Sequence, residues 1–347
     1  MTDHHYHLDF DAEETFQFKS IAFRSPTGYF LHAEKQSTGI EYWIKVTLKK
    51  HTILRYNTPS YLLDNDHIAH LLCIMERTIL ATLQNHPFLP TLSYAMQTSE
   101  YTLLVTEKLH GESLKDLFHL RPTPAFQENV VQFYMAELLL AVQHLHTVGI
   151  VHRNISLHSL FLTKRGHLQL IDFGAAVTTN LQDTLFKKNI RIPLPDIMQT
   201  TNYLPPEYYD GQCIGYAGDL WAVGACLFEL LTGTSLITMD FLRDTHAALN
   251  LLSADAQDLI LQLLRREPAE RPSCEDIQRH AFFQNVQWEE LVVNGARNTA
   301  FGNSTPYIPK MRNFSLARSF TLSNMCEIMK LEMKMISSSG KFPKKKE

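Results

Sequence analysis

The polar residues best suited to catalysis or binding lie inside two apolar segments of the chain, IVHRNISLHSLFL and LIDFGAA. In the first segment an imidazole, a guanidinium and an amide follow one another at His152, Arg153 and Asn154. The second segment places a carboxylate at Asp172. An amide cannot take up a proton near pH 7, and it offers a dipole where a carboxylate would offer a full charge. Position 154 therefore lacks a general base.

The run HHYH near the N-terminus is a second candidate for chemistry, because His4, His5 and His7 could each bind a metal. Structural zinc sites combine such residues with partner ligands at set spacing. No partner motif of that kind accompanies this run, which lies in an acidic stretch. The sequence therefore predicts no metal centre here.

The composition is that of a globular protein, with 347 residues, 45% apolar content and a formal net charge of −4. This balance lacks the basic excess of a nucleic-acid-binding protein, so we expect no nucleic-acid partner. No apolar run reaches the ~18 to 20 residues of a membrane span, and the acidic N-terminus does not resemble a signal peptide. The five cysteines form no paired spacing, which is typical of reduced thiols in a cytoplasmic protein.

The predicted elements run strands first and helices after. From Phe16 to about Lys50, apolar and polar residues alternate between turn signals, which predicts antiparallel strands. A helix is expected over residues 64–84, and helical periodicity dominates after Gly111. This order predicts an α+β fold with two lobes. The expected parts are a flexible N-terminus (1–16), a sheet-rich N-lobe (17–108), a helical C-lobe (109–291) and a partly disordered tail (292–347).

Five short segments in a fixed order make the interpretation more specific. They are IVHRNISLHSLFL (150–162), LIDFGAA (170–176), YLPPE (203–207), GDLWAVG (218–224) and REPAERP (266–272). Together they resemble the signature set of eukaryotic protein kinases. The segments NHPFLPTL (85–92), DIQRHAFFQNVQWEEL (276–291) and PYIPK (306–310) are similar to the AGC group, especially the cyclic-nucleotide-dependent kinases. The resemblance covers roughly residues 17–310 and implies a two-lobed protein kinase fold.

Several positions match the groups with which kinases hold ATP and Mg²⁺. Lys45 matches the strand lysine that binds the α- and β-phosphates, and Glu76 matches the helix glutamate that pairs with it. The alternative is that both are ordinary surface residues. Asp172 matches the magnesium-binding carboxylate, and Phe173 with His152 matches the apolar stack of the active arrangement. The resemblance thus implies ATP and Mg²⁺ as the cofactors of a working site.

The catalytic loop departs from the family pattern at three positions. The family has His-Arg-Asp-Leu-Lys-Pro-Glu-Asn, and residues 152–159 read His-Arg-Asn-Ile-Ser-Leu-His-Ser. Asn154 replaces the aspartate that accepts the hydroxyl proton, and Ser156 replaces the lysine that steadies the phosphate. Ser159 replaces a metal-binding asparagine and offers only a weak neutral ligand. Losing general-base assistance alone typically costs about 10²- to 10⁴-fold in rate, so these replacements predict little or no phosphoryl transfer.

The glycine-rich loop that would cover the phosphates is also reduced. Its pattern aligns with FRSPTG, so only the last glycine, Gly28, is present, and Pro26 has no backbone N–H to donate. An ordinary hairpin turn explains Gly28 equally well. The sequence therefore predicts a poorer phosphate cradle.

Trp43 stands two residues before Lys45, where the family usually has a small alanine against the adenine. An indole there would fill space that the base needs. The alternative is that Trp43 turns into another gap of the core and leaves the pocket open. Where the lobes join, the resemblance assigns Thr106, Glu107 and Leu109 to nucleotide binding. ATP binding is therefore undecided by the sequence.

A further group of positions matches the structural frame of the family. Glu207 and Arg271 match the buried pair that ties the activation segment to the helical lobe. Asp219 matches the helix carboxylate that holds the backbone of the catalytic loop. Asp196 aligns with the phosphothreonine of AGC kinases, with Arg153 as its expected partner, and a solvated loop residue is the equal alternative.

The sequence therefore predicts a pseudokinase of the AGC group, which acts by binding a protein partner such as an active kinase or its substrate. A weak or unconventional serine/threonine kinase is one alternative, because catalysis in this class is largely positioning and electrostatics. A switch that binds ATP without turning it over is the other. We expect a cytoplasmic protein. The basic end KFPKKKE is interpreted first as a solvated end, and a nuclear signal or a contact with an anionic surface are the alternatives.

Overall fold

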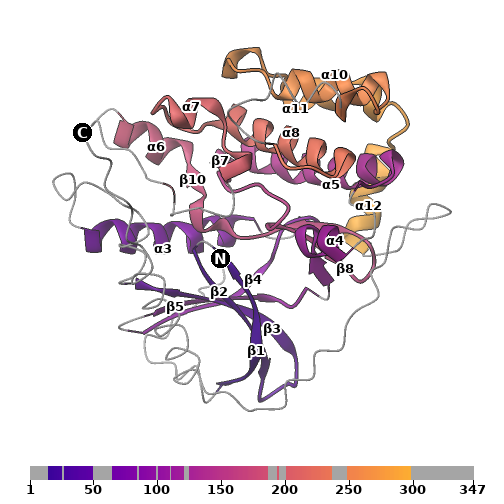
Figure 1. Ribbon diagram of the computed structural model, residues 1–347. Helices are drawn as coiled ribbons and strands as arrows, with labels where there is room; N and C mark the ends of the chain where they lie inside the picture. The colour runs from indigo at the N-terminus through magenta and orange to yellow at the C-terminus, as the bar shows by residue number, and fades with distance from the viewer. Residues whose placement is uncertain are drawn as a thin grey trace, which may run out of the picture.

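The computed structural model describes residues 15–25, 27–49, 65–83, 86–98, 101–109, 111–120, 125–186, 194, 201–236 and 248–297. Within these ranges a sheet-rich lobe is followed by a helical lobe (Figure 1). The α+β, two-lobed architecture predicted from the sequence is therefore confirmed. The predictions that concern His4, His5, His7, Pro26 and Asp196 fall outside the described residues.

The sheet-rich lobe is an antiparallel sheet with one long helix. Its strands are β1 (Phe16–Ser25), β2 (Gly28–Lys35), β3 (Glu41–Leu48), β4 (Leu92–Gln97) and β5 (Tyr101–Glu107), in the order β1-β2-β3-β5-β4. Helix α3 (Asn65–Thr82) lies between this sheet and the helical lobe (Figure 1), close to the bounds expected from its periodicity. The strand and helix that carry Lys45 and Glu76 are thereby brought together at the junction of the lobes.

The helical lobe is built around two long helices, α5 (Glu128–Thr147) and α8 (Tyr216–Thr232). The shorter helices are α4 (Leu114–Leu120), α6 (Thr179–Phe186), α7 (Pro206–Tyr209), α10 (Ala254–Leu263), α11 (Cys274–Gln278) and α12 (Trp288–Arg297). Small sheets formed by β6 (Gly111–Ser113), β7 (Ile150–Val151), β8 (Leu160–Thr163), β9 (Leu168–Leu170) and β10 (Val177–Thr178) carry the loops at the junction.

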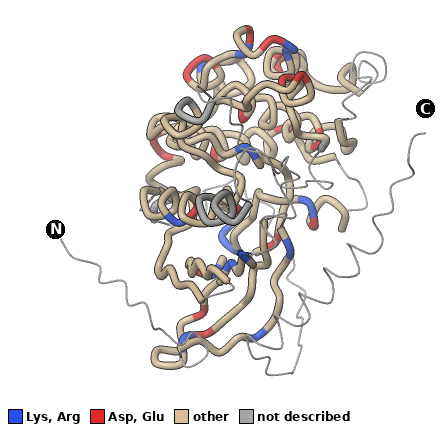
Figure 2. The backbone as a smooth tube through the Cα atoms, turned by 90° about the vertical axis from the view of Figure 1, so that its left-hand side faces the viewer, with Lys and Arg blue, Asp and Glu red and all other residues tan. Residues whose placement is uncertain are grey.

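Charged residues of both signs are distributed along the chain. Lysine and arginine residues are interspersed with aspartate and glutamate over both lobes (Figure 2). In the described part of the chain, no helix is long and apolar enough to cross a membrane. The same residues contain no group of three or more His, Cys, Asp or Glu side chains that could hold a metal ion.

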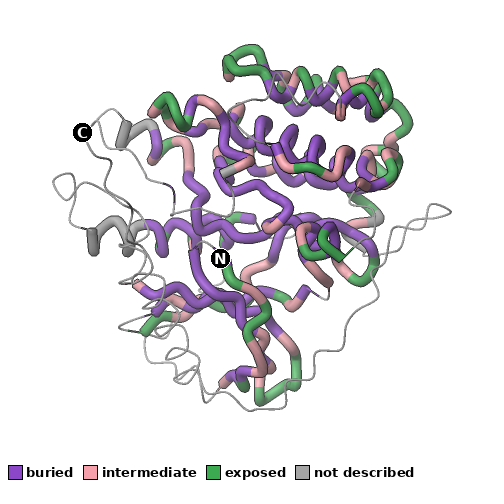
Figure 3. Tube along the Cα trace, viewed as in Figure 1, coloured by how far each residue is buried: buried purple, intermediate pink, exposed green. Residues whose placement is uncertain are grey.

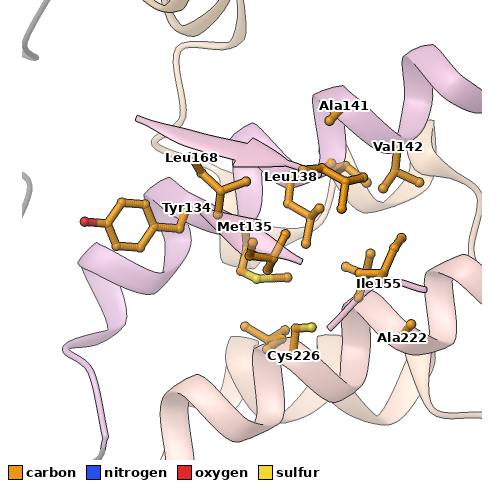
Figure 4. Close-up of a cluster of buried hydrophobic side chains, with 14 of the residues drawn as sticks. Tyr134, Met135, Leu138, Ala141, Val142, Ile155, Leu168, Ala222 and Cys226 are labelled. Atoms are coloured by element: carbon orange, nitrogen blue, oxygen red, sulfur yellow. The ribbon is translucent and has the colours of Figure 1, made fainter. Parts of the chain in front are cut away.

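The core of the helical lobe fixes the position of the catalytic loop. Helix α8 is buried without interruption from Gly218 to Leu231 (Figure 3), as expected for a helix that is apolar nearly all round. Ile155, which lies within the loop, is only 2% exposed. Its side chain lies beside Ala222 of α8 and close to Val142 of α5 (Figure 4). The loop is therefore anchored by apolar packing whatever polar residues flank Ile155.

A buried ion pair ties α7 to the helical lobe. The Nη1 and Nη2 atoms of Arg271 donate to the two carboxylate oxygens of Glu207, each at 2.7 Å. Arg271 Nη1 also donates to the Ala217 carbonyl at 2.8 Å, and the guanidinium stands 5.0 Å from the Trp221 ring centroid. Both partners of the pair are buried, at 4% and 7% exposure. Such a bidentate pair is directional and leaves few donors unsatisfied.

We expect Arg271→Ala to lower the free energy of unfolding by about 3–5 kcal/mol, because Glu207 would be left as a buried, uncompensated charge. Urea denaturation followed by circular dichroism measures this change. Arg266→Ala is the matched control, since Arg266 pairs with Asp210 at 3.1 Å with side chains 72% and 47% exposed. The control should cost at most about 1 kcal/mol, and equal losses in the two variants would contradict a stabilising role for the buried pair.

Candidate nucleotide and catalytic site

Lys45, Glu76 and Asp172 meet where the lobes join. The Nζ atom of Lys45 lies 2.5 Å from Glu76 Oε1 and 2.7 Å from Asp172 Oδ1. Strand β3 directs Lys45 to this junction because its neighbours Ile44 and Val46 point into the core on the other face of the sheet. Each of the three charged residues is at most 5% exposed. Neither Lys45 nor Glu76 is therefore a surface residue, which removes that alternative.

The charges of this cluster stabilise one another. Burial lowers the pKa of Lys45, but the carboxylates of Asp172 and Glu76 outweigh that effect and raise it above its ordinary value. Burial raises the pKa of Asp172, yet the charge and hydrogen bonds of Lys45 and the hydroxyl of Thr27 leave it below its usual value. Burial likewise raises the pKa of Glu76. Lys45 opposes this rise, but the nearby Asp172 carboxylate adds to it, so the pKa of Glu76 stays above its ordinary value. Lys45 and Asp172 are accordingly held as charged partners.

The remaining positions around the Asp172 carboxylate are occupied by side-chain donors. Thr27 Oγ1 donates to Asp172 Oδ1 at 2.7 Å, and Asn154 Nδ2 donates to Oδ2 at 2.9 Å. The hydroxyl of Ser25 lies 3.2 Å from that of Thr27 and accepts the backbone N–H of Gly28 at 3.1 Å. Both oxygens of the carboxylate that the resemblance assigns to magnesium therefore face protein hydrogen-bond donors.

Sequence reasoning missed Thr27, although it stands in the degraded glycine loop. Thr27 can approach Asp172 only because residue 174, two positions after Asp172, is a glycine. A Cβ at Gly174 would lie 2.2 Å from Thr27 Oγ1 and 2.6 Å from Lys45 Nζ. The signal available in the sequence was a hydroxyl side chain at a variable position of that loop, next to Gly28. Its partner could not be read from sequence spacing, because 145 residues separate Thr27 from Asp172.

The backbone of the loop at residues 152–159 is held by Asp219 and by the packing of its neighbouring rings. Asp219 accepts the backbone N–H groups of His152 and Arg153, both at 2.8 Å, and Arg153 Nε donates to the Ala175 carbonyl at 2.8 Å. Arg153 and Asp172 have φ of 62° and 65°, a left-handed conformation that non-glycine residues seldom adopt. The rings of His152 and Phe173 pack edge to face at 4.8 Å. Asp219 is therefore placed to hold the loop backbone.

Ser156 and Ser159 do not face the Asp172 carboxylate as reacting groups. Ser159 Oγ donates to the backbone carbonyls of Asn154 (2.8 Å) and Ser156 (3.0 Å), and it accepts the N–H of Ser156 at 3.0 Å. Within the described residues, the hydroxyl of Ser156 and the Oδ1 atom of Asn154 are buried without a hydrogen-bond partner. Ser159 thus braces the loop, and its hydroxyl is committed to backbone groups instead of a metal.

Trp43 lies in a cluster of aromatic and aliphatic side chains on the junction side of the sheet. Phe23 stacks on Phe30 at 4.3 Å, and Trp43 contacts Phe161 edge to face at 4.7 Å. The strand register explains the cluster, because Phe23 is opposite Phe30 on β1 and β2, and Phe30 is opposite Lys45 on β3. With Leu109 and Ile171 these residues form one buried group. Trp43 therefore stays at the cleft and does not turn into another gap.

The cavity left beside this cluster is small. It measures about 20 Å³ and is lined by residues that include Trp43, Lys45, Glu76, Thr106, Leu109 and Asp172. A cavity needs a volume of roughly 10–15 Å³ to hold one water molecule, whereas small-molecule sites typically offer about 300–1,000 Å³. In this arrangement the cleft has no room for an adenine nucleotide.

The three residues assigned to the segment between the lobes fall in different surroundings. Thr106 and Leu109 are buried at 8% and 9% exposure and line the small cavity. Glu107 is exposed and lines a separate cavity on another side of the segment. The structure thus brings Thr106 and Leu109 to the cleft, and it places Glu107 away from it.

Taken as it stands, the site does not fit MgATP. The aromatic cluster fills the space of the base, and Lys45, Thr27 and Asn154 use the oxygens of Asp172 that would otherwise face a cation. The polar side chains of Lys45, Thr27, Asn154 and Asp172 instead form hydrogen bonds with one another across the junction of the lobes. They include no carboxylate at position 154 that could accept a proton from a hydroxyl.

Comparisons with known proteins agree with this fold. The protein kinase domain model matches residues 63–283. The RAC family serine/threonine-protein kinase homolog of Dictyostelium discoideum is 30% identical over 288 residues, which cover 80% of this chain and 59% of that protein. The ribosomal protein S6 kinase alpha-6 of Homo sapiens is 36% identical over 229 residues, covering 62% of this chain and 29% of that protein. The RAC serine/threonine-protein kinase of Drosophila melanogaster is 29% identical over 294 residues, which cover 81% of this chain and 44% of that protein.

The chain thus spans between 29% and 59% of the length of these relatives. The kinase domain match extends over more than half of the chain, and these relatives are AGC-type kinases. Together with the two lobes and the Lys45–Glu76–Asp172 cluster, this match shows that the chain belongs to the protein kinase family, with relatives in the AGC group.

Proposed function

We propose that this chain is a protein kinase-like protein that performs little or no phosphoryl transfer and serves as a scaffold or allosteric regulator in signalling. The observation that carries the proposal is the filled cleft, in which aromatic side chains leave about 20 Å³ where a nucleotide would bind. The hydrogen bonds from Thr27 and Asn154 to Asp172 support it further. The partner would be a protein, either an active kinase or its substrate, which the kinase relatives favour.

A weak or unconventional serine/threonine kinase is the second candidate. It is favoured by the intact Lys45–Glu76 pair at 2.5 Å and by the names of the relatives, which are serine/threonine kinases. MgATP binding would require Trp43 to leave the cleft and Thr27 and Asn154 to release Asp172. A nucleotide-responsive switch would need the same opening without the chemistry. Both alternatives therefore depend on whether ATP can open the cleft.

We expect isothermal titration of the full chain with ATP to detect no binding, with or without Mg²⁺. Trp43→Ala should create measurable binding, because removing the indole leaves a space beside Lys45 that the base can enter. Trp288→Ala is the matched control, since Trp288 packs on Phe283 in the helical lobe at a ring distance of 5.5 Å. That variant should gain no binding. Magnesium-dependent binding by the unchanged chain, lost in Lys45→Ala, would contradict the filled cleft.

We expect no radiolabel transfer from ATP to a basic peptide, because position 154 offers no base and position 156 no cation. The measurement is filter-bound counts against a buffer blank, with Asp172→Ala as the control that separates the chain from a contaminating kinase. A signal that Asp172→Ala abolishes would refute the proposal and favour the weak kinase.

We expect Asn154→Asp to destabilise the folded chain instead of creating activity. The Asn154 amide donates to Asp172 at 2.9 Å, so an aspartate would place two buried carboxylates in contact. Like charges at this distance force one carboxyl to take a proton and raise its pKa. The penalty should be about 1–3 kcal/mol at pH 7 and should shrink as the pH falls through that raised pKa. Added Mg²⁺ should also reduce it, because a cation neutralises the pair.

Chemical denaturation at pH 7 and pH 5, with and without Mg²⁺, measures this response. Asn154→Ala is the matched control, because it removes the same hydrogen bond and adds no charge. It should lose about 1 kcal/mol independently of pH and Mg²⁺. If Asn154→Asp were as stable as the unchanged chain at pH 7, the amide would not be a required donor. Substantial phosphoryl transfer by Asn154→Asp would show that positions 156 and 159 matter less than proposed.

A further inference from the structure

A second cavity lies behind the segment that joins the lobes, away from the filled cleft. It measures about 680 Å³ and lies among the segment 86–91, the joining residues 107–109, the turn between β8 and β9, and Gly295 of α12. This volume is within the roughly 300–1,000 Å³ range of small-molecule sites. The molecule therefore offers space for a ligand here, although the nucleotide cleft is closed.

The cavity has a cationic rim. Its lining contains Lys108, Lys164 and Arg165 against one carboxylate, Glu107. Lys108 pairs with Glu41 at 2.8 Å, and Lys164 and Arg165 are both exposed at the rim. The whole chain has a formal net charge of −4, and charged residues of both signs are distributed along it (Figure 2). A local positive excess at a cavity favours an anionic ligand.

A buried imidazole adds to the polar wall. His167 lines the cavity with only 4% exposure, and its Nδ1 atom lies 2.6 Å from the Glu137 carboxylate. Glu137 is itself fixed, because its other oxygen accepts the backbone N–H of Leu168 at 2.7 Å. The ring of His167 is therefore held in one orientation from behind. A preorganised polar group of this kind is what binding sites use to orient a ligand.

The opposite wall is apolar. Pro87, Leu89, Pro90 and Leu109 contribute to the lining, so a ligand that is only an inorganic anion would leave much of the space unused. Pro90 and Leu109 also line the small cavity of the cleft. A molecule bound behind the joining segment would thus contact side chains that also border the aromatic cluster around Trp43.

We propose that this cavity binds a small molecule with a phosphate or carboxylate group and an apolar ring, with Lys164 and Arg165 contacting the anion. Arginine and lysine together suit a doubly charged phosphate, because charge-assisted hydrogen bonds are about twice as strong as neutral ones. The ring would lie against Pro87, which is the half-buried member of the apolar lining. The proposal is independent of whether the chain transfers phosphate, because none of these residues contacts Asp172.

Phenyl phosphate is the probe, with benzoate as the carboxylate arm and benzyl alcohol as the neutral arm, titrated into the full chain by calorimetry and ligand-observed NMR. We expect saturable binding of phenyl phosphate, weaker binding of benzoate, and no binding of benzyl alcohol. Lys164→Ala/Arg165→Ala should raise the Kd of phenyl phosphate at least tenfold. Arg265→Ala/Arg266→Ala, another exposed basic pair on the helical lobe, should change it less than twofold.

A second variant tests the space itself. Thr91→Trp, at a partly buried lining position, should abolish binding by filling the cavity while all cationic residues stay in place. Binding of the unchanged chain should also weaken when NaCl rises from about 50 to 500 mM, because salt screens exposed charges. The proposal would be overturned if phenyl phosphate showed no saturable binding, or if benzyl alcohol bound as tightly as phenyl phosphate. It would also be overturned if the two arginine-containing double variants changed the Kd of phenyl phosphate equally.

Discussion

The contact between the lobes depends on one buried ammonium group that two carboxylates share. Glu76 approaches Lys45 from the sheet-rich lobe and Asp172 approaches it from the helical lobe, at 2.5 and 2.7 Å. A buried ion cluster is stable only if its remaining oxygens are satisfied as well. Thr27 and Asn154 supply these donors, so the cluster is complete with side chains alone. The two lobes thus meet at Asp172 through side chains of the chain itself.

The loop that carries Asn154 is held mainly by interactions that do not involve the side chains of Asn154 and Ser156. Left-handed backbone at Arg153 and Asp172 costs of order 1–3 kcal/mol each, so the surroundings must impose it. Asp219 fixes the loop through two backbone N–H groups, and Ile155 anchors it in the core. Because these restraints are separate from positions 154 and 156, the reacting side chains can change while the loop keeps its shape.

Much of the fold was predictable, because its signals are local or periodic. The strand alternation near Phe16 and the helix around Glu76 follow directly from the positions of apolar residues, and the ordered motifs predict the lobes. The role of Trp43 in filling the cleft was also open to prediction. The contact of Thr27 with Asp172 and the position of Phe161 against Trp43 were not predictable, because each joins residues more than a hundred positions apart. Such contacts are set by the tertiary structure and leave no pattern in spacing.

The aromatic cluster explains why the cleft can stay closed without a ligand. Phe23, Phe30 and Trp43 project from the sheet, and Phe161 meets them from the helical lobe. Aromatic contacts of this kind contribute about 0.5–1.5 kcal/mol per pair beyond the burial of their area. They act between the same two lobes that the Lys45 cluster joins, so polar and apolar contacts favour the same closed state. Side chains from both lobes therefore fill the cleft at their junction.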